Sequence, residues 1–409
     1  MPEIFKKITW LLPSKTNPTC CSYCNLFLDC GFNFEPYFYN ERLLLLDRNS
    51  FESELIEFCK HADLVIVSLW SSSHELSPEL IYEIRKNSRT VLFSLDDEIY
   101  STMQSISYAN SIDLVISTDF FGRGLFEQAG VPTIYFPFHK YLTNYNTSGI
   151  TEKTIDVSFI GNSNVADRKN YLQALIDAGV QLEVFGAGSK NGYISKKDYI
   201  EIIKKSRINL NFTKPLISKR VNKYEPWRHY MRQIKGRPFE VAALGSFCLS
   251  EWSPPSKYIF SDKTEIPLFN CNKTLIEKVH FYLSHSEERE LCARSTNKRF
   301  LERYSFPGSF IALMNEIKNN LDSNNSSRLL GSNLHTHSMD YLERANLSYL
   351  QKFVASLSSS SDPRIESKSK NAKRPIQALI RLAQYLNYHA LIFSILKSFG
   401  ELYRHLRKS

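Results

Sequence analysis

Apolar runs of strand length alternate with segments of helical length along most of this chain, and that alternation limits the folds available to it. The run at 62–70 is apolar almost throughout, as is typical of a strand buried on both faces of a parallel sheet. Over the first 140 residues, strands are predicted at 8–12, 62–70, 90–95, 112–117 and 133–138. Segments of helical length lie near 77–87, 99–109 and 121–129. This order predicts β–α–β units in a doubly wound α/β sheet.

A polar stretch at 139–154 is followed by a second alternation of the same kind. The predicted strands are 156–160, 181–185, 208–212 and 246–249. Helices are predicted from about residue 168 and at 196–206, 238–244, 273–284, 286–304 and 307–320. The chain has 409 residues, which is enough for two full hydrophobic cores. The sequence therefore predicts two Rossmann-like domains in series, at residues 1–140 and 151–320.

The composition changes after residue 320. Residues 321–372 contain stretches rich in Ser and Asn and are interpreted as a linker, whereas 373–409 predict a basic amphipathic helix. The chain carries a net charge of +9, and residues 361–409 hold ten Lys and Arg against three Asp and Glu. The remaining body is almost neutral, which argues against a nucleic-acid-binding groove on it.

The tail helix has two interpretations. Its apolar side chains flanked by Lys and Arg are typical of a helix lying on an anionic membrane surface. Alternatively, it packs on the body of the protein or on a second copy in a homodimer. No apolar run reaches the ~18–20 residues that a membrane-spanning helix needs, and the first residues lack the apolar core of a signal peptide. We therefore expect a cytoplasmic protein, bound peripherally to the inner face of the membrane if the tail binds lipid.

Four of the eight cysteines, Cys20, Cys21, Cys24 and Cys30, lie close together in the sequence. The spacing of Cys21 and Cys24 is found in zinc sites, but no second pair follows at the distance that such sites require. A disulfide framework is not expected in a chain of this length without a secretory signal. The cysteines are interpreted as reduced residues packed on a helix, and no metal site is expected.

Glycines and basic residues follow several strands of the second predicted domain. Ligands of open parallel sheets bind at the carboxyl ends of the strands, where backbone N–H groups are free. Such positions are Gly161-Asn162, the turn from Gly186 to Gly188, Lys214, and the helix start from Gly236 to Glu240. Two glycine turns, a basic residue and a helix N-terminus in one domain indicate binding of a nucleotide diphosphate.

Glu240 lies in a helix whose other residues are small and apolar. A carboxylate in such a helix is costly to bury unless it has a partner. It could accept hydrogen bonds from a ribose diol, or it could form an ion pair with Arg237, one helical turn before it. Both interpretations remain open from spacing alone.

From Asp156 to about Phe306 the sequence resembles the C-terminal, donor-binding domain of GT-B glycosyltransferases, and more narrowly the CgeB-like, glycosyltransferase group 1 type. About 150 residues share this resemblance, and the first 140 agree with the family only in layout. The matching segments are 156–161 with Arg168, 183–186, 208–212, 236–240 through 245–247, and 264–269. The resemblance implies two Rossmann-like domains facing a central cleft and transfer of a sugar from a nucleotide-sugar donor.

The resemblance also implies roles for single residues. Glu240 would bind the donor ribose, and Gly161 would let the pyrophosphate approach the backbone, with Asn162 and Gly186 beside it. Lys214, Arg168 and Arg237 would neutralise the diphosphate leaving group. The implied enzyme is a retaining, hexosyltransferase-like and metal-independent one, with the nucleotide sugar as co-substrate and no other cofactor. The sequence departs from the wider retaining group at Arg232, where a second carboxylate often stands.

The acceptor side is assigned to the first domain. Asp97 and His139 follow predicted strands, and either could bind or deprotonate an acceptor hydroxyl. Together with Arg237 they form the predicted catalytic set. The alternative for Asp97 is that acidic residues commonly cap helices.

The predicted function is transfer of a sugar to a glycan or lipid-linked acceptor, in the synthesis of a cell-surface polysaccharide or glycolipid. Two other classes remain open, because a fold does not determine a function. One is a non-catalytic protein that binds a nucleotide sugar or a glycan. The other is a nucleotide-sugar epimerase, which would convert the donor without an acceptor.

Overall fold

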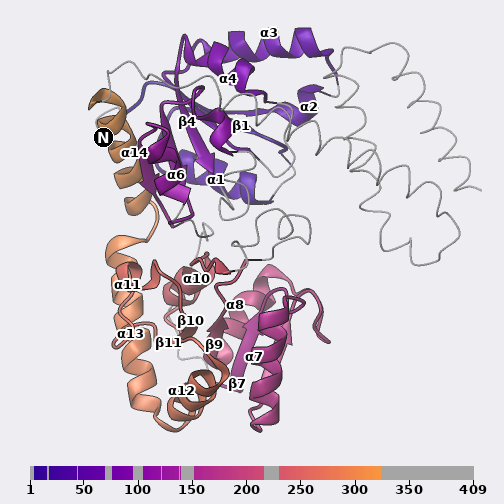
Figure 1. The fold of residues 1–409 in the computed structure, drawn as a ribbon, viewed down its shortest axis with the longest axis vertical. Coiled ribbons are helices and arrows are strands. Elements are labelled where there is room, and N and C mark those ends of the chain that lie inside the picture. Colours follow the sequence, from indigo (N-terminus) through magenta and orange to yellow (C-terminus); the bar gives the residue numbers. More distant parts are fainter. Residues whose placement is uncertain are drawn as a thin grey trace, which may run out of the picture. The chain divides into compact units, whose positions relative to one another are not determined.

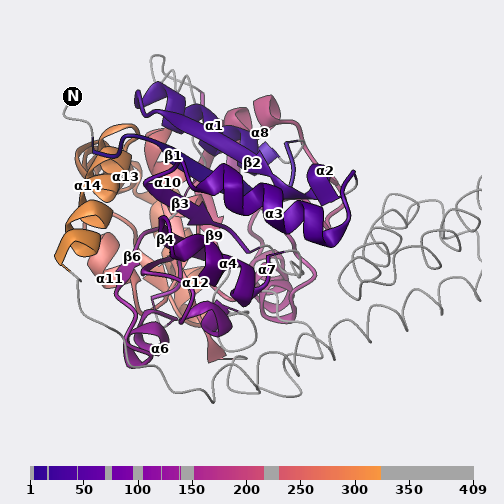
Figure 2. The same ribbon diagram turned by 90° about the horizontal axis from the view of Figure 1, so that it is seen from above.

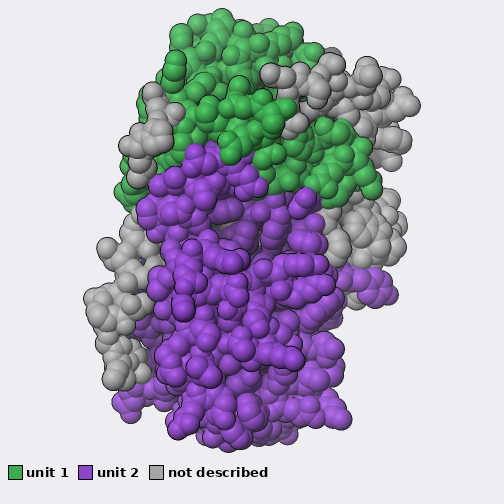
Figure 3. Space-filling model, turned by 90° about the vertical axis from the view of Figure 1, so that its left-hand side faces the viewer, with its two compact units in different colours: residues 1–116, 124–134, 317–409 green, residues 117–123, 135–316 purple. Residues whose placement is uncertain are grey.

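Two parallel sheets, each flanked by helices, make up the fold (Figure 1). The computed structural model describes residues 4–15, 18–43, 45–69, 76–94, 105–120, 122–137, 139, 152–215 and 230–323. The chain divides into one unit of residues 1–116, 124–134 and 317–409 and another of residues 117–123 and 135–316 (Figure 3). Asp97, the tail at 373–409 and all of the linker beyond residue 323 lie outside the described residues.

The first sheet has six strands in the order β2-β1-β3-β4-β5-β6. Their bounds are β1 Ile8–Leu12, β2 Phe34–Phe38, β3 Leu64–Val67, β4 Arg89–Ser94, β5 Leu114–Ser117 and β6 Thr133–Tyr135. β1 pairs in parallel with β2 on one side and with β3 on the other. The five strands predicted in this part of the chain are present, and β2 was not predicted. Because the chain runs from β1 to β2 and then returns to β3, the order of strands reverses beside β1.

Helices cover both faces of this sheet. They are α1 Pro18–Asp29, α2 Tyr39–Leu43, α3 Arg48–Cys59, α4 Pro78–Arg85, the 3₁₀ helix η1 Ser105–Tyr108, and α6 Gly122–Gln128. Successive side chains of a strand point to opposite faces. Trp10 of β1 contacts Tyr23 and Phe27 of α1, whereas Leu11 belongs to the core cluster shared with α3 and α4. Figure 2 shows α1 and α3 on different sides of these strands.

Side-chain caps mark the starts of α3 and α4. Asp47 accepts a hydrogen bond from the backbone N–H of Ser50 at 3.0 Å. Ser77 accepts one from Leu80 N–H at 3.2 Å, and Pro78 occupies the first position of its helix. Both arrangements satisfy N–H groups that have no partner within the helix. α4 lies within the segment predicted as helical at 77–87.

Cys20, Cys21 and Cys24 lie on α1, as their interpretation as helix residues requires, and all eight cysteines are free. Burial raises the pKa of Cys20 to about 12 and that of Cys24 to about 11, so these thiols stay protonated near neutral pH. The described part of the chain contains no group of three or more His, Cys, Asp and Glu arranged to hold a metal ion.

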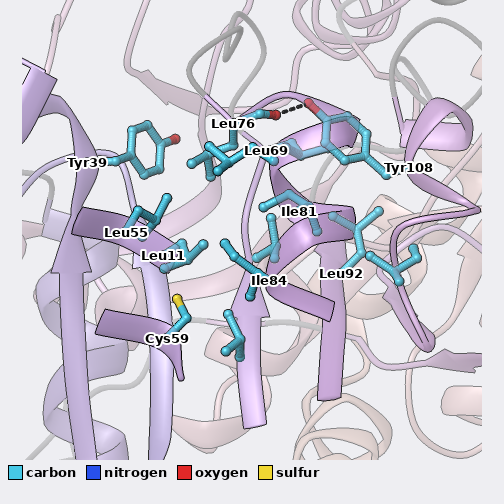
Figure 4. Close-up of a cluster of buried hydrophobic side chains, with 14 of the residues drawn as sticks. Leu11, Tyr39, Leu55, Cys59, Leu69, Leu76, Ile81, Ile84, Leu92 and Tyr108 are labelled. Atoms are coloured by element: carbon cyan, nitrogen blue, oxygen red, sulfur yellow. Dashed lines mark hydrogen bonds between the residues drawn. The ribbon is translucent and has the colours of Figure 1, made fainter. Parts of the chain in front are cut away.

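The core of the first unit lies between its sheet and the helices α3 and α4 (Figure 4). It joins Leu11 and Leu92 of the strands with Leu55 of α3 and Ile81 of α4. Tyr108 is fully buried in this cluster, and its hydroxyl donates a hydrogen bond to the backbone carbonyl of Leu76.

The second sheet has the order β11-β10-β9-β7-β8. Its strands are β7 Ile155–Ile160, β8 Leu182–Phe185, β9 Ser206–Asn211, β10 Cys248–Glu251 and the short β11 Leu268–Phe269. β7 pairs in parallel with β8 on one side and with β9 on the other. The strand order therefore reverses between β7 and β9, and in open parallel sheets ligands bind at the carboxyl end of such a switch point.

The helices of the second unit are α7 Ala166–Asp177, α8 Lys196–Lys205, α10 Arg237–Ala243, α11 Ser256–Ile259, α12 Asn272–Ser284, α13 Ser286–Arg303 and α14 Gly308–Ser323. From Ile317 onward, α14 belongs to the first unit. One buried cluster joins the sheet to α7 and α12, and another joins it to α8 and α10. Within the described residues, no helix is both long enough and apolar enough to cross a membrane.

A polar ladder crosses the middle of the second sheet. Leu210 of β9 points into the cluster with α7 and α12, so the alternating Asn209 and Asn211 point to the other face. The amide oxygen of Asn209 accepts a hydrogen bond from Ser158 of β7 at 3.2 Å. The amide nitrogen of Asn211 donates to Ser250 of β10 at 2.8 Å. These side chains are buried, and their hydrogen bonds join three adjacent strands.

Replacing Tyr108 by Phe tests the buried hydrogen bond of the first core. Tyr108→Phe keeps the ring but leaves the carbonyl of Leu76 without this donor, so we expect the free energy of unfolding to fall by about 1–3 kcal/mol in urea titrations. Tyr82→Phe is the control, because the ring of Tyr82 is 47% exposed. Equal stability of the two variants would contradict the expectation.

Candidate functional site

Two glycine turns approach each other at the carboxyl edge of the second sheet. Gly161 follows β7, and its N–H donates to the carbonyl of Phe185, the last residue of β8, at 2.8 Å. Gly186 follows at φ +103°, and a Cβ there would lie 2.5 Å from the carbonyl oxygen of Gly161. Such contact excludes any other residue at 186 without a shift of the backbone. The structure thus joins the two turns predicted from the sequence.

Asn162 and Ser163 shape the turn after β7. The side-chain oxygen of Asn162 accepts the N–H of Asn164 at 2.9 Å. The N–H of Ser163 donates to the carbonyl of Ala187 at 2.9 Å, which ties this turn to the loop after β8. The side chain of Asn162 therefore organises its own turn, while its backbone carbonyl accepts a hydrogen bond from Arg168.

Arg168, in the first turn of α7, connects the ends of β7 and β9. Its Nη1 donates to the carbonyl of Asn162 at 2.8 Å and its Nη2 to that of Lys214 at 2.7 Å. Nε has no hydrogen-bond partner among the described residues. Burial lowers the pKa of Arg168. The negative charge of Glu251 opposes this shift, and the positive charge of Arg237, which lies nearby, adds to it. An additional anion in this region would be stabilised by both guanidinium groups.

Lys214 forms part of a network of charged side chains at the ends of β9 and β10 and the start of α7. Its Nζ lies 2.6 Å from Asp167, and the Nη2 of Arg232 lies 3.2 Å from the same carboxylate. Arg232 Nε donates to Glu251 Oε1 at 3.0 Å. Glu251 Oε2 accepts the N–H groups of Thr213 at 2.8 Å and Lys214 at 3.3 Å. Lys214 is only 6% exposed and already paired, so its charge first balances Asp167.

Arg237 and Glu240 lie one turn apart on α10. Glu240 is 4% exposed, and its Oε2 accepts a hydrogen bond from the hydroxyl of Tyr199 on α8. Arg237 Nε lies 3.8 Å from the same oxygen, and its guanidinium lies over the ring of Tyr199 at 4.8 Å. The ion pair considered from the sequence is therefore present, but its atoms are too far apart for a hydrogen bond. Tyr199 is a second partner of Glu240.

His139 packs among aromatic rings of the second unit, against α10. It is 3% exposed and is stacked on Phe239 and on Phe306. Its Nε2 lies 2.9 Å from the carbonyl oxygen of Tyr304. These contacts favour a structural role in the second unit, so His139 as an acceptor base stays a prediction without support from its surroundings. The other acceptor candidate, Asp97, lies outside the described residues.

The structure thus gathers the predicted donor-site residues at one edge of the second sheet and adds four others. These are Asp167, Tyr199, Arg232 and Glu251. Of these four, Arg232 was recognisable from the sequence only as a departure from a family pattern, and the other three were not predicted. Four basic side chains and three carboxylates meet here, and a backbone without side chains lies beside them at Gly161 and Gly186. Such a site can hold an anion against the backbone while a carboxylate accepts hydrogen bonds from a polyol.

The chain is similar to known proteins in part of its sequence and in its fold. Residues 168–309 match the family model described as glycosyl transferase-like. No curated protein matches the sequence. HepE of Anabaena, solved with UDP and glucose, is 12% identical, with a TM-score of 0.52 over 78% of this chain and 100% of its own. Sucrose-phosphate synthase of Thermosynechococcus elongatus is 10% identical, with a TM-score of 0.51 and the same coverage. At such identities the likeness concerns the fold alone, and it confirms the predicted fold class of two Rossmann-like domains of GT-B type.

Adding a methyl group at Gly186 tests the contact between the two turns. Gly186→Ala should lower the free energy of unfolding by at least about 2 kcal/mol, because the backbone must move to relieve the contact with Gly161. Gly192→Ala is the control in the same loop, since its φ is also positive, at +63°, but no atom lies within 4 Å of the added carbon. Urea titration should show the smaller loss for the control, and equal losses would contradict the expectation.

Neutralising Glu251 tests the network of charged side chains. Glu251→Gln places an NH₂ group where either Arg232 or the Thr213 and Lys214 N–H groups now find an oxygen. We expect a loss of about 2–4 kcal/mol in the free energy of unfolding. Asp156→Asn removes an ion pair with Arg207, whose side chain is 43% exposed, and should cost under about 1 kcal/mol. Similar losses in both variants would argue against a special role of Glu251.

Proposed function

We propose that this chain transfers a sugar from a nucleotide-sugar donor to a glycan or lipid-linked acceptor, because residues 168–309 match the family model described as glycosyl transferase-like. The observation that carries the proposal is the edge of the second sheet where Gly161 and Gly186 adjoin buried and half-buried basic groups and the buried carboxylate of Glu240. The phosphates and the ribose of a nucleoside diphosphate each have a matching group there. The backbone of the glycine turns meets the phosphates, and Glu240 accepts the ribose hydroxyls.

The chemical requirement of sugar transfer is stabilisation of the leaving diphosphate. The bond between the anomeric carbon of the sugar and the oxygen of the diphosphate breaks, and negative charge grows on that oxygen. Fixed positive groups stabilise this charge. Arg168 and Arg237 meet this requirement best. Lys214 and Arg232 lie within 2.6–3.2 Å of carboxylates, whereas Arg168 donates to backbone carbonyls and Arg237 stays 3.8 Å from Glu240. We propose that these side chains supply the charge without a metal ion, and that transfer retains the anomeric configuration, as the family resemblance implies.

The acceptor and the cellular setting are further parts of the proposal. A glycan or lipid-linked acceptor of a cell-surface polysaccharide or glycolipid agrees with a basic tail at 373–409 that could lie on an anionic membrane. UDP-sugars are the first donors to test, because HepE, similar in fold, has been solved with UDP-glucose. Two alternatives remain, a non-catalytic binding protein and a nucleotide-sugar epimerase.

Nucleotide binding can be measured by thermal shift with UDP, GDP, ADP and CMP. One of them should stabilise the wild-type protein, and Glu240→Ala should weaken its binding by about 10–100-fold, since a charged hydrogen-bond acceptor is lost. Glu201→Ala removes a carboxylate from the outer side of α8 and is the control. Failure of all four to stabilise the wild type would count against the proposal.

Turnover separates the three functions. A transferase releases the nucleoside diphosphate from its sugar donor and forms a product with an acceptor. Binding without release of the diphosphate would support the non-catalytic protein. Conversion of the nucleotide sugar into an isomer, with no acceptor added, would support the epimerase.

A further inference from the structure

We propose that Tyr199 is a positioning residue that orients Glu240 and Arg237, and that this arrangement selects ribonucleotide donors over their 2′-deoxy forms. The inference rests on the proposed function, because it concerns the same donor site. The family resemblance assigns no role to Tyr199, and the selectivity for ribose can be measured independently of the acceptor.

Tyr199 is held firmly in place. α8 begins after Ser195, whose hydroxyl accepts the N–H of Asp198 at 3.1 Å. The helix buries Tyr199 and Ile203 in the cluster that also contains Phe239 of α10. Figure 1 shows α8 and α10 near the same end of the second sheet. A tyrosine fixed in this way can impose its own geometry on the side chains that it contacts.

The hydroxyl of Tyr199 determines which oxygen of Glu240 is available. It donates to Oε2, and no other hydrogen bond to this carboxylate is found among the described residues. A buried carboxylate is costly without such a donor, so the hydrogen bond favours one rotamer. Oε1 is then left to accept a hydrogen bond from a ribose hydroxyl.

The ring of Tyr199 controls Arg237 separately. The guanidinium lies over the ring face at 4.8 Å, a distance at which the cation and the ring attract each other. Its Nε lies 3.8 Å from Glu240 Oε2, beyond hydrogen-bond distance, and has no hydrogen-bond partner among the described residues. Tyr199 therefore keeps a cation and a carboxylate close together without letting them form a direct hydrogen bond. Arg237 remains available to a phosphate and Glu240 to a ribose.

Removing the hydroxyl of Tyr199 while keeping its ring should let Arg237 and Glu240 form a direct hydrogen bond. In Tyr199→Phe, Oε2 of Glu240 loses its donor, and a direct hydrogen bond from Arg237 becomes its best replacement. The carboxylate would then turn away from the ribose. We therefore expect the loss of selectivity between ribose and deoxyribose to exceed the loss of affinity for the diphosphate.

The test is calorimetric titration of the full chain with UDP, ADP and GDP and with their 2′-deoxy counterparts. Wild type should bind the ribonucleotide about 10-fold more tightly than its deoxy form, as expected for one hydrogen bond to a carboxylate. In Tyr199→Phe this ratio should fall to about 1–2, because the ribose contact is lost. Tyr193→Phe is the matched control, since Tyr193 is 86% exposed on the loop before α8, and it should keep the wild-type ratio.

Two further variants separate a positioning role from a structural one. Tyr199→Leu removes the ring as well, so Arg237 loses the aromatic face over which it lies. This variant should therefore bind both ribo- and deoxynucleotides more weakly than Tyr199→Phe does. In a Glu240→Ala background, Tyr199→Phe should not change the ratio, because no carboxylate remains to be oriented. A wild-type ratio in Tyr199→Phe would overturn the inference, even if Glu240→Ala abolishes selectivity. Absence of binding by the wild type would instead overturn the proposed function.

Discussion

The carboxylate of Glu251 is the group on which the candidate site depends. It accepts the backbone N–H groups that follow β9 and the side chain of Arg232, and so it links β9, β10 and the segment before α10. The carbonyl of Lys214 in turn orients Arg168. Four basic side chains so close together would repel one another without such a buried anion. Glu251 therefore lets the site hold its positive charge before any ligand is present.

Arg232 shows how the charges are arranged differently from the pattern that the resemblance suggests. A carboxylate often stands at this position in the wider retaining group, and here a guanidinium lies between Asp167 and Glu251. Arg232 is thus part of the charge network that supports the site. The carboxylate that remains beside the proposed donor site is Glu240, which accepts a hydrogen bond from Tyr199 on another helix. In the proposed function, recognition of the donor ribose therefore depends on α8 and α10.

The fold was largely predictable, because burial on both faces makes the strands continuous apolar runs. All nine predicted strands are present, and the fold class is confirmed. β2 escaped prediction because Glu35 and Pro36 interrupt its pattern at the edge of the sheet, where a strand is only partly buried. The site was predicted in part. Glycines and basic residues at strand ends carry a local signal, whereas Tyr199 and Glu240 meet across 41 positions of the chain. The surroundings of His139 likewise depend on rings more than 90 positions away.

The ladder of Asn209, Asn211, Ser158 and Ser250 has a consequence for the way the second sheet assembles. Purely apolar strands can pair in several registers at similar cost, since one leucine replaces another. A shift of β9 by one residue would turn both asparagine amides toward the apolar cluster under α7 and α12 and leave their polar atoms without partners. The ladder thus selects the register in which the central strands pair during folding. It makes one pairing of the central strands much better than its neighbours, and with it fixes the position at which each strand ends.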